Sequence, residues 1–304
     1  MKIKDGICGF IIGDALGVPV EFTSRETLQK NPVKMMKGYG TYNMPPGTFS
    51  DDTSMTLATM NSICNKKAID FEDIQSEFSE WLFNDKYTQY GTFDYGETTF
   101  NSLSKFKDGF KALNCGGTGE MDNGNGSLMR ILPLAFIPDI NYETIENVSA
   151  LTHAHLRSKI ACVLYVEIAK SMFSSDLTIK EHIKIASDKV KKYYNNSNEL
   201  KHFKRIFNDD LNKDIKSSGY VIDTLESVIY CLKTTDNYKD SVLKAVNLGE
   251  DTDTIAAICG GLSGIYYGFD SIPIDWLNQI EKINNVITLC EKYEGVINEY
   301  WKNY

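Results

Sequence analysis

Apolar side chains recur every three or four positions along most of this chain, which is the spacing of an amphipathic α-helix. Residues 140–271 contain no proline, so nothing in that stretch forces a helix to end. Alternating strand patterns with hairpin turns are hard to find. Two predicted helical faces consist of Leu156, Ile160, Val163, Leu164 and Ile168, and of Val221, Leu225, Val228, Ile229 and Leu232. We predict an all-α protein, a compact orthogonal multi-helix fold with one domain over residues 1–304.

Four segments depart from the simple amphipathic pattern. Residues 39–49 and 114–127 are rich in glycine, proline and asparagine, which predicts loops. Residues 195–218 are polar and charged, which predicts a surface segment. Residues 255–266 are apolar on all sides and contain small residues, which predicts a buried helix in tight contact with its neighbours. Small residues at Gly9, Gly13, Ala15 and Gly17 predict a second helix of this kind.

Two acidic clusters precede or open predicted helices about 200 residues apart. The first is Ser50-Asp51-Asp52-Thr53, and the second is Asp251-Thr252-Asp253-Thr254. Helix capping is the simplest explanation, because Ser and Asp favour N-terminal positions, but it accounts for one acid per helix and not for two. If the fold joins the clusters, their oxygens suit a hard cation such as Mg²⁺ or Mn²⁺.

Composition narrows the function classes. The formal net charge is −9, so the chain has no general attraction for nucleic-acid backbones. The seven cysteines are scattered and never spaced as CxxC, which predicts free thiols in a reducing compartment and no zinc site. No run reaches transmembrane length and no secretory signal is evident, so we expect a cytoplasmic protein without a membrane partner.

Two further motifs offer chemistry with simple structural alternatives. The run 122–130, DNGNGSLMR, could bind an anion through backbone N–H groups if its Asn-Gly pairs adopt positive φ, or could be an ordinary turn. The histidines of THAH, His153 and His155, could equally be structural. In GDALGVPVEF, Asp14 and Glu21 are the only acids, and either could be a cap or a buried functional acid.

The order of these motifs resembles the ADP-ribosylglycohydrolases. The matching runs are GDALGVPVEF, GTFSDDTSM, NGNGSLMR, THAH and NLGEDTDTIAAICGGLSGIYYG, which together extend from Gly9 to Gly268. The resemblance implies a compact all-α fold with two Mg²⁺ or Mn²⁺ ions. The metal ligands that it implies are Ser50, Asp51, Asp52, Asp251, Asp253 and Thr254.

The same resemblance assigns other roles. It implies catalytic roles for Glu21, Asp52 and Asp251, and a structural one for Asp14. The ADP-ribose ligands that it implies are Asn123, Gly124, Asn125, Gly126, Ser127 and His153. An additional acid is expected from residues 91–117, with Asp94 and Glu97 as candidates.

The expected function is a metal-dependent hydrolase that removes ADP-ribose from a modified protein side chain, with arginine as the expected acceptor. The alternatives are a serine- or O-linked ADP-ribose hydrolase, a non-catalytic ADP-ribose-binding relative, and a phosphohydrolase that uses the same metals. The expected partners are ADP-ribose and an ADP-ribosylated protein, with a monomeric enzyme and no nucleic acid.

Overall fold

The computed structural model describes residues 2–173, 177–211 and 213–301. Within these ranges the regular elements are helices, and the β-contacts are three isolated bridges. The prediction of an all-α fold is therefore confirmed. The α-helices are α1 (Ile3–Gly17), α2 (Arg25–Lys30), α3 (Asp51–Lys66), α4 (Phe71–Asn84), α5 (Glu97–Lys107), α6 (Tyr142–Ala150), α7 (Leu156–Ser171), α8 (Ile179–Tyr193), α9 (Lys204–Phe207), α10 (Val221–Lys233), α11 (Tyr238–Val246), α12 (Thr252–Tyr267), α13 (Ile274–Leu277) and α14 (Ile283–Tyr300).

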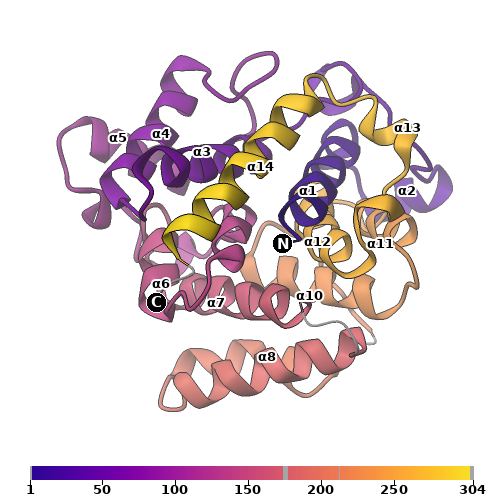
Figure 1. The fold of residues 1–304 in the computed structure, drawn as a ribbon. Coiled ribbons are helices and arrows are strands. Elements are labelled where there is room, and N and C mark those ends of the chain that lie inside the picture. Colours follow the sequence, from indigo (N-terminus) through magenta and orange to yellow (C-terminus); the bar gives the residue numbers. More distant parts are fainter. Residues whose placement is uncertain (1, 174–176, 212, 302–304) are drawn as a thin grey trace.

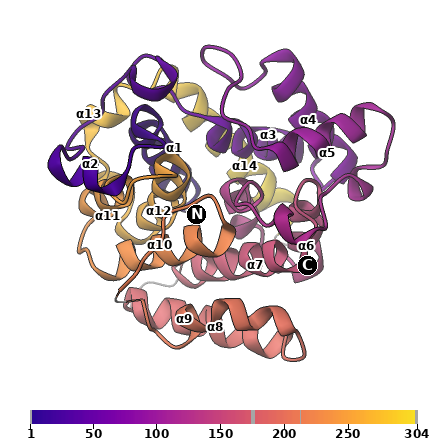
Figure 2. The ribbon, with the colours of Figure 1, turned by 180° about the vertical axis from the view of Figure 1, so that it is seen from behind.

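Short 3₁₀ turns join many of these helices. They are η1 (Val18–Val20), η2 (Gly40–Tyr42), η3 (Ala112–Asn114), η4 (Glu120–Asp122), η5 (Leu128–Arg130), η6 (Leu132–Phe136), η7 (Asn198–Phe203) and η8 (Phe269–Ser271). In Figures 1 and 2, α3, α4 and α5 lie on one side of the molecule, and α1, α11 and α12 lie on the other. Helix α8 is outermost in both views, with α7 and α10 between it and the rest.

Helices α1 and α12 touch backbone to backbone at the centre of the fold. A Cβ on Gly9 would lie 2.4 Å from the carbonyl oxygen of Gly260, and one on Gly13 would lie 2.0 Å from that of Ala256. Only glycine allows this approach, because any side chain would push the helices apart. The predicted close contact is confirmed. It fixes the start of α12 against the end of α1, where a Cβ on Gly17 would lie 2.3 Å from the Cα of Asp253.

Most described residues of 195–218 are exposed or partly exposed, as expected for a surface segment, but Phe203, Ile206 and Leu211 are buried and join the core. Leu156, on one of the predicted helical faces, is 38% exposed because it is the first residue of α7. Among the described residues, no helix has both the length and the apolar character needed to cross a membrane.

Candidate metal centre and substrate pocket

The two acidic clusters meet, although about 200 residues separate them. Ser50 is the N-cap of α3, and Asp251 occupies the same position before α12. The hydroxyl of Thr254 donates to Oδ2 of Asp52 at 3.1 Å, and the hydroxyl of Ser50 reaches the same oxygen at 3.1 Å. Residues from both predicted clusters therefore share one carboxylate oxygen.

Helix capping does not explain these acids. The side chain of Ser50 accepts from the N–H of Asp52 and so caps α3, while Asp251 makes no capping hydrogen bond to α12. Oδ1 of Asp52 and both carboxylate oxygens of Asp253 are buried without a hydrogen-bond partner. Buried polar atoms are normally paired, and a buried charge is normally compensated by a partner charge or a metal. These three oxygens are the kind of donor that a divalent cation would satisfy.

The electrostatics of the cluster agree with this interpretation. Burial, and then repulsion from neighbouring carboxylates, raises the pKa values of Asp51, Asp52 and Asp253 well above the usual range. Burial also raises the pKa of Asp251 to about 6, although Asn125 donates to its Oδ2 at 2.7 Å. The site thus concentrates negative charge that the protein alone does not neutralise.

Asp14 holds the first cluster in place from α1. Its carboxylate accepts hydrogen bonds from the backbone N–H of Ser50 at 2.9 Å and from that of Thr53 at 3.0 Å. The hydroxyl of Thr53 donates to it as well, at 2.6 Å. Asp14 is fully buried and does not line the substrate pocket. These contacts fit the structural role that we expected for it.

Glu21 and Asp94 add two more carboxylates beside the clusters. Carboxylate oxygens of Glu21, Asp94 and Asp253 all lie within 4.8 Å of one another. The hydroxyl of Tyr42 lies 2.6 Å from Oε2 of Glu21 and 2.6 Å from Oδ1 of Asp94. Burial, and then Asp94, raises the pKa of Glu21 to about 9. Of the two additional acids considered, Asp94 joins the cluster, whereas Glu97 is exposed at the pocket rim.

A pocket of about 470 Å³ opens onto this cluster. It is lined by Glu21, Phe22, Asp51, Asp94, Gly96, Glu97, Thr98, Thr99, Met121, Gly124, Asn125, Gly126, Met129, His153, Ser218, Gly219, Glu250, Asp251 and Thr254. Most of the site residues predicted from the sequence therefore line this one pocket. Ser50, Asp52 and Asp253 are almost fully buried and are not among the lining residues, so they lie behind the pocket surface.

The loop that contains Gly124 and Gly126 packs on His153. Residues 123–127 all have negative φ, so the idea that their Asn-Gly pairs adopt positive φ is wrong. Gly126 is needed instead for packing, because a Cβ there would lie 2.7 Å from Cε1 of His153. Burial lowers the pKa of His153 to about 3, so its ring is neutral at pH 7.

The ring of His153 is held from behind by Thr152. Nδ1 of His153 lies 2.9 Å from the hydroxyl of Thr152, which also accepts a hydrogen bond from Arg130 at 2.7 Å. His153 lines the pocket, so this contact fixes a neutral imidazole at the pocket wall.

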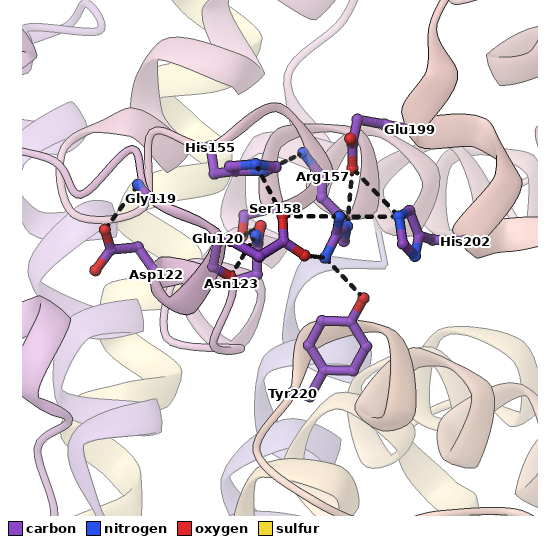
Figure 3. Close-up of polar contacts among 10 residues, drawn as sticks. All are labelled: Gly119, Glu120, Asp122, Asn123, His155, Arg157, Ser158, Glu199, His202 and Tyr220. Carbon is purple, nitrogen blue, oxygen red and sulfur yellow. Dashed lines mark hydrogen bonds and ion pairs between the residues drawn. The ribbon is translucent and has the colours of Figure 1, made fainter.

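Two predicted ligand-binding residues use their side chains inside the protein. The hydroxyl of Ser127 is buried and pairs with Ser149 and Cys162. Asn123 accepts from Ser158 at 3.0 Å and donates to the backbone of Glu120 at 3.0 Å (Figure 3). Their side chains hold the loop, and only Asn123 borders a neighbouring pocket.

That neighbouring pocket, of about 500 Å³, shares Met121, Gly124 and Gly219 with the first. Its wall includes Arg157 and Tyr220, which sequence reasoning missed. Figure 3 shows how the Arg157 guanidinium joins three elements: it pairs with Glu120 of η4 at 2.6 Å, Glu199 of η7 at 2.8 Å and the Tyr220 hydroxyl at 3.1 Å. Because Glu120 and Asn123 are adjoining parts of one loop, this network fixes the loop between the two pockets.

An all-α fold with an oxygen-rich acidic centre beside a pocket is an arrangement that suits a hydrolase, and comparison with known proteins identifies the family. The sequence model of the ADP-ribosylglycohydrolase family matches residues 1–303. The chain therefore belongs to this family, which confirms the resemblance found in the sequence. It is an enzyme of the ADP-ribosylglycohydrolase family.

Three similar proteins and one solved structure show the extent of the relationship. The chain is 31% identical to ADP-ribosylarginine hydrolase Tri1 of Serratia proteamaculans, over 96% of this chain and 78% of that one. It is 31% identical to ADP-ribosyl-[dinitrogen reductase] glycohydrolase of Rhodospirillum rubrum, over 90% and 88%. It is 25% identical to mouse ADP-ribosylhydrolase ARH3, over 98% and 92%. A solved ADP-ribosylglycohydrolase-related protein complex has the same fold, with a TM-score of 0.83 at 24% identity, over 97% of this chain and 98% of that one.

Proposed function

We propose that this protein uses two Mg²⁺ or Mn²⁺ ions to hydrolyse the bond between ADP-ribose and a modified arginine side chain of a protein. The observation that carries the proposal is the meeting of two acidic clusters with three unpartnered, buried carboxylate oxygens beside a pocket of about 470 Å³. The names of the relatives support the substrate class, because each acts on an ADP-ribosyl linkage.

The residues present fit a pair of hard cations. The donors are hydroxyl and carboxylate oxygens with no nearby sulfur ligand, which favours Mg²⁺ or Mn²⁺ over zinc. We assign metal binding to Ser50, Asp51, Asp52, Asp251, Asp253 and Thr254. When bound, such ions would orient ribose hydroxyls and would hold and acidify a water molecule for attack at C1″.

Glu21, Tyr42 and Asp94 form a proton-sharing unit at the pocket. A phenol has one proton, so Tyr42 cannot donate fully to both carboxylates at 2.6 Å. One of the two short contacts therefore calls for a protonated carboxyl group, and burial beside Asp94, which raises the pKa of Glu21, favours the protonated form of Glu21. Cations close to Glu21 would favour its ionised form, so substrate and metal binding can change its protonation.

The reaction needs a group of this kind. Water supplies a hydroxyl to C1″ of the ribose, and the bond from C1″ to the arginine nitrogen breaks. The second proton of water ends on the leaving nitrogen, which yields ADP-ribose and unmodified arginine. We assign Glu21 to this proton transfer, as the residue that activates water or protonates the leaving group. Asp52 and Asp251, which we expected to be catalytic, would act through the metals, because Asp52 lies behind the pocket surface.

The two adjoining pockets match the two ends of ADP-ribose. The distal ribose would lie over the acidic cluster, and the diphosphate would pass Gly124 and the imidazole of His153. The adenosine end would reach the second pocket, where the Tyr220 ring offers a stacking surface. This placement uses the shared residues Met121, Gly124 and Gly219 as the passage between the pockets.

A product assay tests the proposal directly. The protein is incubated with peptides that carry ADP-ribose on arginine or on serine, with Mg²⁺, with Mn²⁺ or with EDTA. We expect free ADP-ribose from the arginine peptide, and we expect EDTA to abolish its release. AMP or inorganic phosphate as the product would support a phosphohydrolase instead. Release only from the serine peptide would move the acceptor assignment to serine, and full activity in EDTA would overturn the metal assignment.

A further inference from the structure

Phe22 lies in an unusual position at the mouth of the substrate pocket. It directly follows Glu21, lines the pocket, and is 67% exposed. Its φ is +61°, a left-handed conformation that a bulky side chain rarely adopts. Such conformations persist where the surrounding structure enforces them, and they concentrate at functional sites.

Glu250 enforces this conformation from the opposite end of the chain. The N–H of Phe22 donates to the carbonyl of Glu250 at 2.7 Å, and the N–H of Glu250 donates to the carbonyl of Thr23 at 2.9 Å. Glu250 itself has a φ of +63°, is exposed, and lines the same pocket. The paired turns direct Glu21 and Asp251 to the acidic centre and leave the neighbouring Phe22 and Glu250 at the rim.

The rim is where the acceptor must lie. The acceptor belongs to a protein that stays in solvent, so it approaches the pocket from the mouth, where Phe22 and Glu250 are exposed lining residues. In addition to Phe22, the exposed residues that line the pocket include two acids, Glu250 and Glu97. An aromatic face with nearby carboxylates attracts a planar cation and gives no such advantage to the neutral ether-type oxygen of an ADP-ribosylated serine.

We propose that Phe22 and Glu250 select the acceptor by holding the guanidinium of an ADP-ribosylated arginine at the pocket mouth, with the Phe22 ring against its plane and the Glu250 carboxylate supplying the opposite charge. This inference rests on the proposed function, because it concerns the same site and reaction. It adds that the preference for arginine resides in the rim, apart from the metal ligands and the ADP-ribose loop.

The test compares two peptides of identical sequence that carry ADP-ribose on arginine or on serine, with Mg²⁺-loaded protein. Phe22→Leu keeps an apolar side chain and removes the aromatic face. We expect it to lower kcat/KM for the arginine peptide about twofold to thirtyfold, the range for loss of a cation–π contact. Release from the serine peptide, where measurable, should change less than about twofold. Phe22→Tyr keeps an aromatic ring and should retain the preference for the arginine peptide. Glu250→Gln should reduce that preference, as Phe22→Leu does.

Two controls separate this role from a structural one. Phe110→Leu makes the same substitution at an exposed phenylalanine that does not line the pocket, and it should leave both rates unchanged. Calorimetric affinity for free ADP-ribose, which has no acceptor, should be the same for Phe22→Leu and the unmodified protein. Equal losses on both peptides, or an unchanged preference, would overturn the inference while leaving the proposed function intact. If the unmodified protein releases ADP-ribose from neither peptide, the proposed function itself fails.

Discussion

Gly13→Ala tests whether the contact between α1 and α12 is as tight as the structure shows. A Cβ at this position would lie 2.0 Å from the carbonyl oxygen of Ala256, whereas Cβ atoms essentially never approach within 3.0 Å. The obstacle is backbone, so no side-chain rotation relieves it. The helices would have to separate by about 1 Å locally, since 3.0 minus 2.0 is 1.0, and overpacking of this kind costs about 3 kcal/mol.

The intrinsic effect of the substitution has the opposite sign. Alanine in a helix is favoured over glycine by about 1 kcal/mol, so the net loss at Gly13 should be about 2 kcal/mol. Gly295 provides the matched control, because it is exposed within α14 and a Cβ there would meet no atom within 4 Å. Gly295→Ala should therefore stabilise the protein by up to about 1 kcal/mol.

Thermal and urea unfolding, followed by far-ultraviolet circular dichroism at one fixed Mg²⁺ concentration, measure both changes. We expect the Tm to fall by about 3 °C for Gly13→Ala and to rise by up to about 2 °C for Gly295→Ala. A Gly13→Ala protein as stable as the unmodified chain would refute the argument, since it would show that the helices separate without cost. A destabilised Gly295→Ala protein would show that the intrinsic helix preference was misjudged.

Three other predictions concern the site. Mg²⁺ should raise the Tm of the unmodified protein, because it binds the folded state. Asp253→Asn should stabilise the EDTA-treated protein, because the substitution removes a buried carboxylate that has no partner, and it should abolish most of the rise in Tm with Mg²⁺. If calorimetry shows the same Mg²⁺ response in Asp253→Asn, Asp253 is not a ligand. Glu21→Gln should slow single-turnover hydrolysis at least tenfold (about 1.4 kcal/mol) and leave ADP-ribose affinity near its original value, and a variant with the original rate would make Glu21 a structural acid. The pKa of His153 is lowered in the folded protein, so as the pH falls the unfolded chain binds the proton before the folded chain does. Compared with His153→Gln, the unmodified protein should therefore lose about 1.4 kcal/mol of unfolding free energy for each pH unit between about 6.5 and 3. Parallel pH profiles for these two proteins would refute the neutral buried state.

The sequence was informative where short motifs carry chemistry on regular elements. Asp51 and Asp253 could be placed at helix starts because hydroxyl and acidic residues precede apolar helical runs, and Gly13 could be assigned to a close helix contact. That the two clusters meet was an inference from their chemistry, and Thr254 donating to Asp52 bears out this meeting. The roles of these residues as metal ligands remain predictions.

Other parts of the site leave no comparable pattern. Tyr42 lies in a 3₁₀ turn, and only tertiary packing brings its hydroxyl between Glu21 and Asp94. Arg157 looks like any charged residue near a helix start, yet it is 4% exposed because Glu120 and Glu199 arrive from distant segments. The sign of φ at Gly126 was missed because glycine permits both signs, and the packing of His153 decides between them.

The centre draws its oxygens from residues that are synthesised far apart in time. When Asp51 and Asp52 leave the ribosome, Asp251 and Asp253 have not yet been synthesised. Helix α12, which packs against the glycines of α1, is also still missing. Joining segments so distant in sequence carries a large loop-closure cost, which is recovered only once both are present. A chain truncated before α12 would keep many of its helices and yet have no complete site. Activity therefore requires synthesis to proceed through α12, so a chain that ends before this helix should be inactive and not merely weakened.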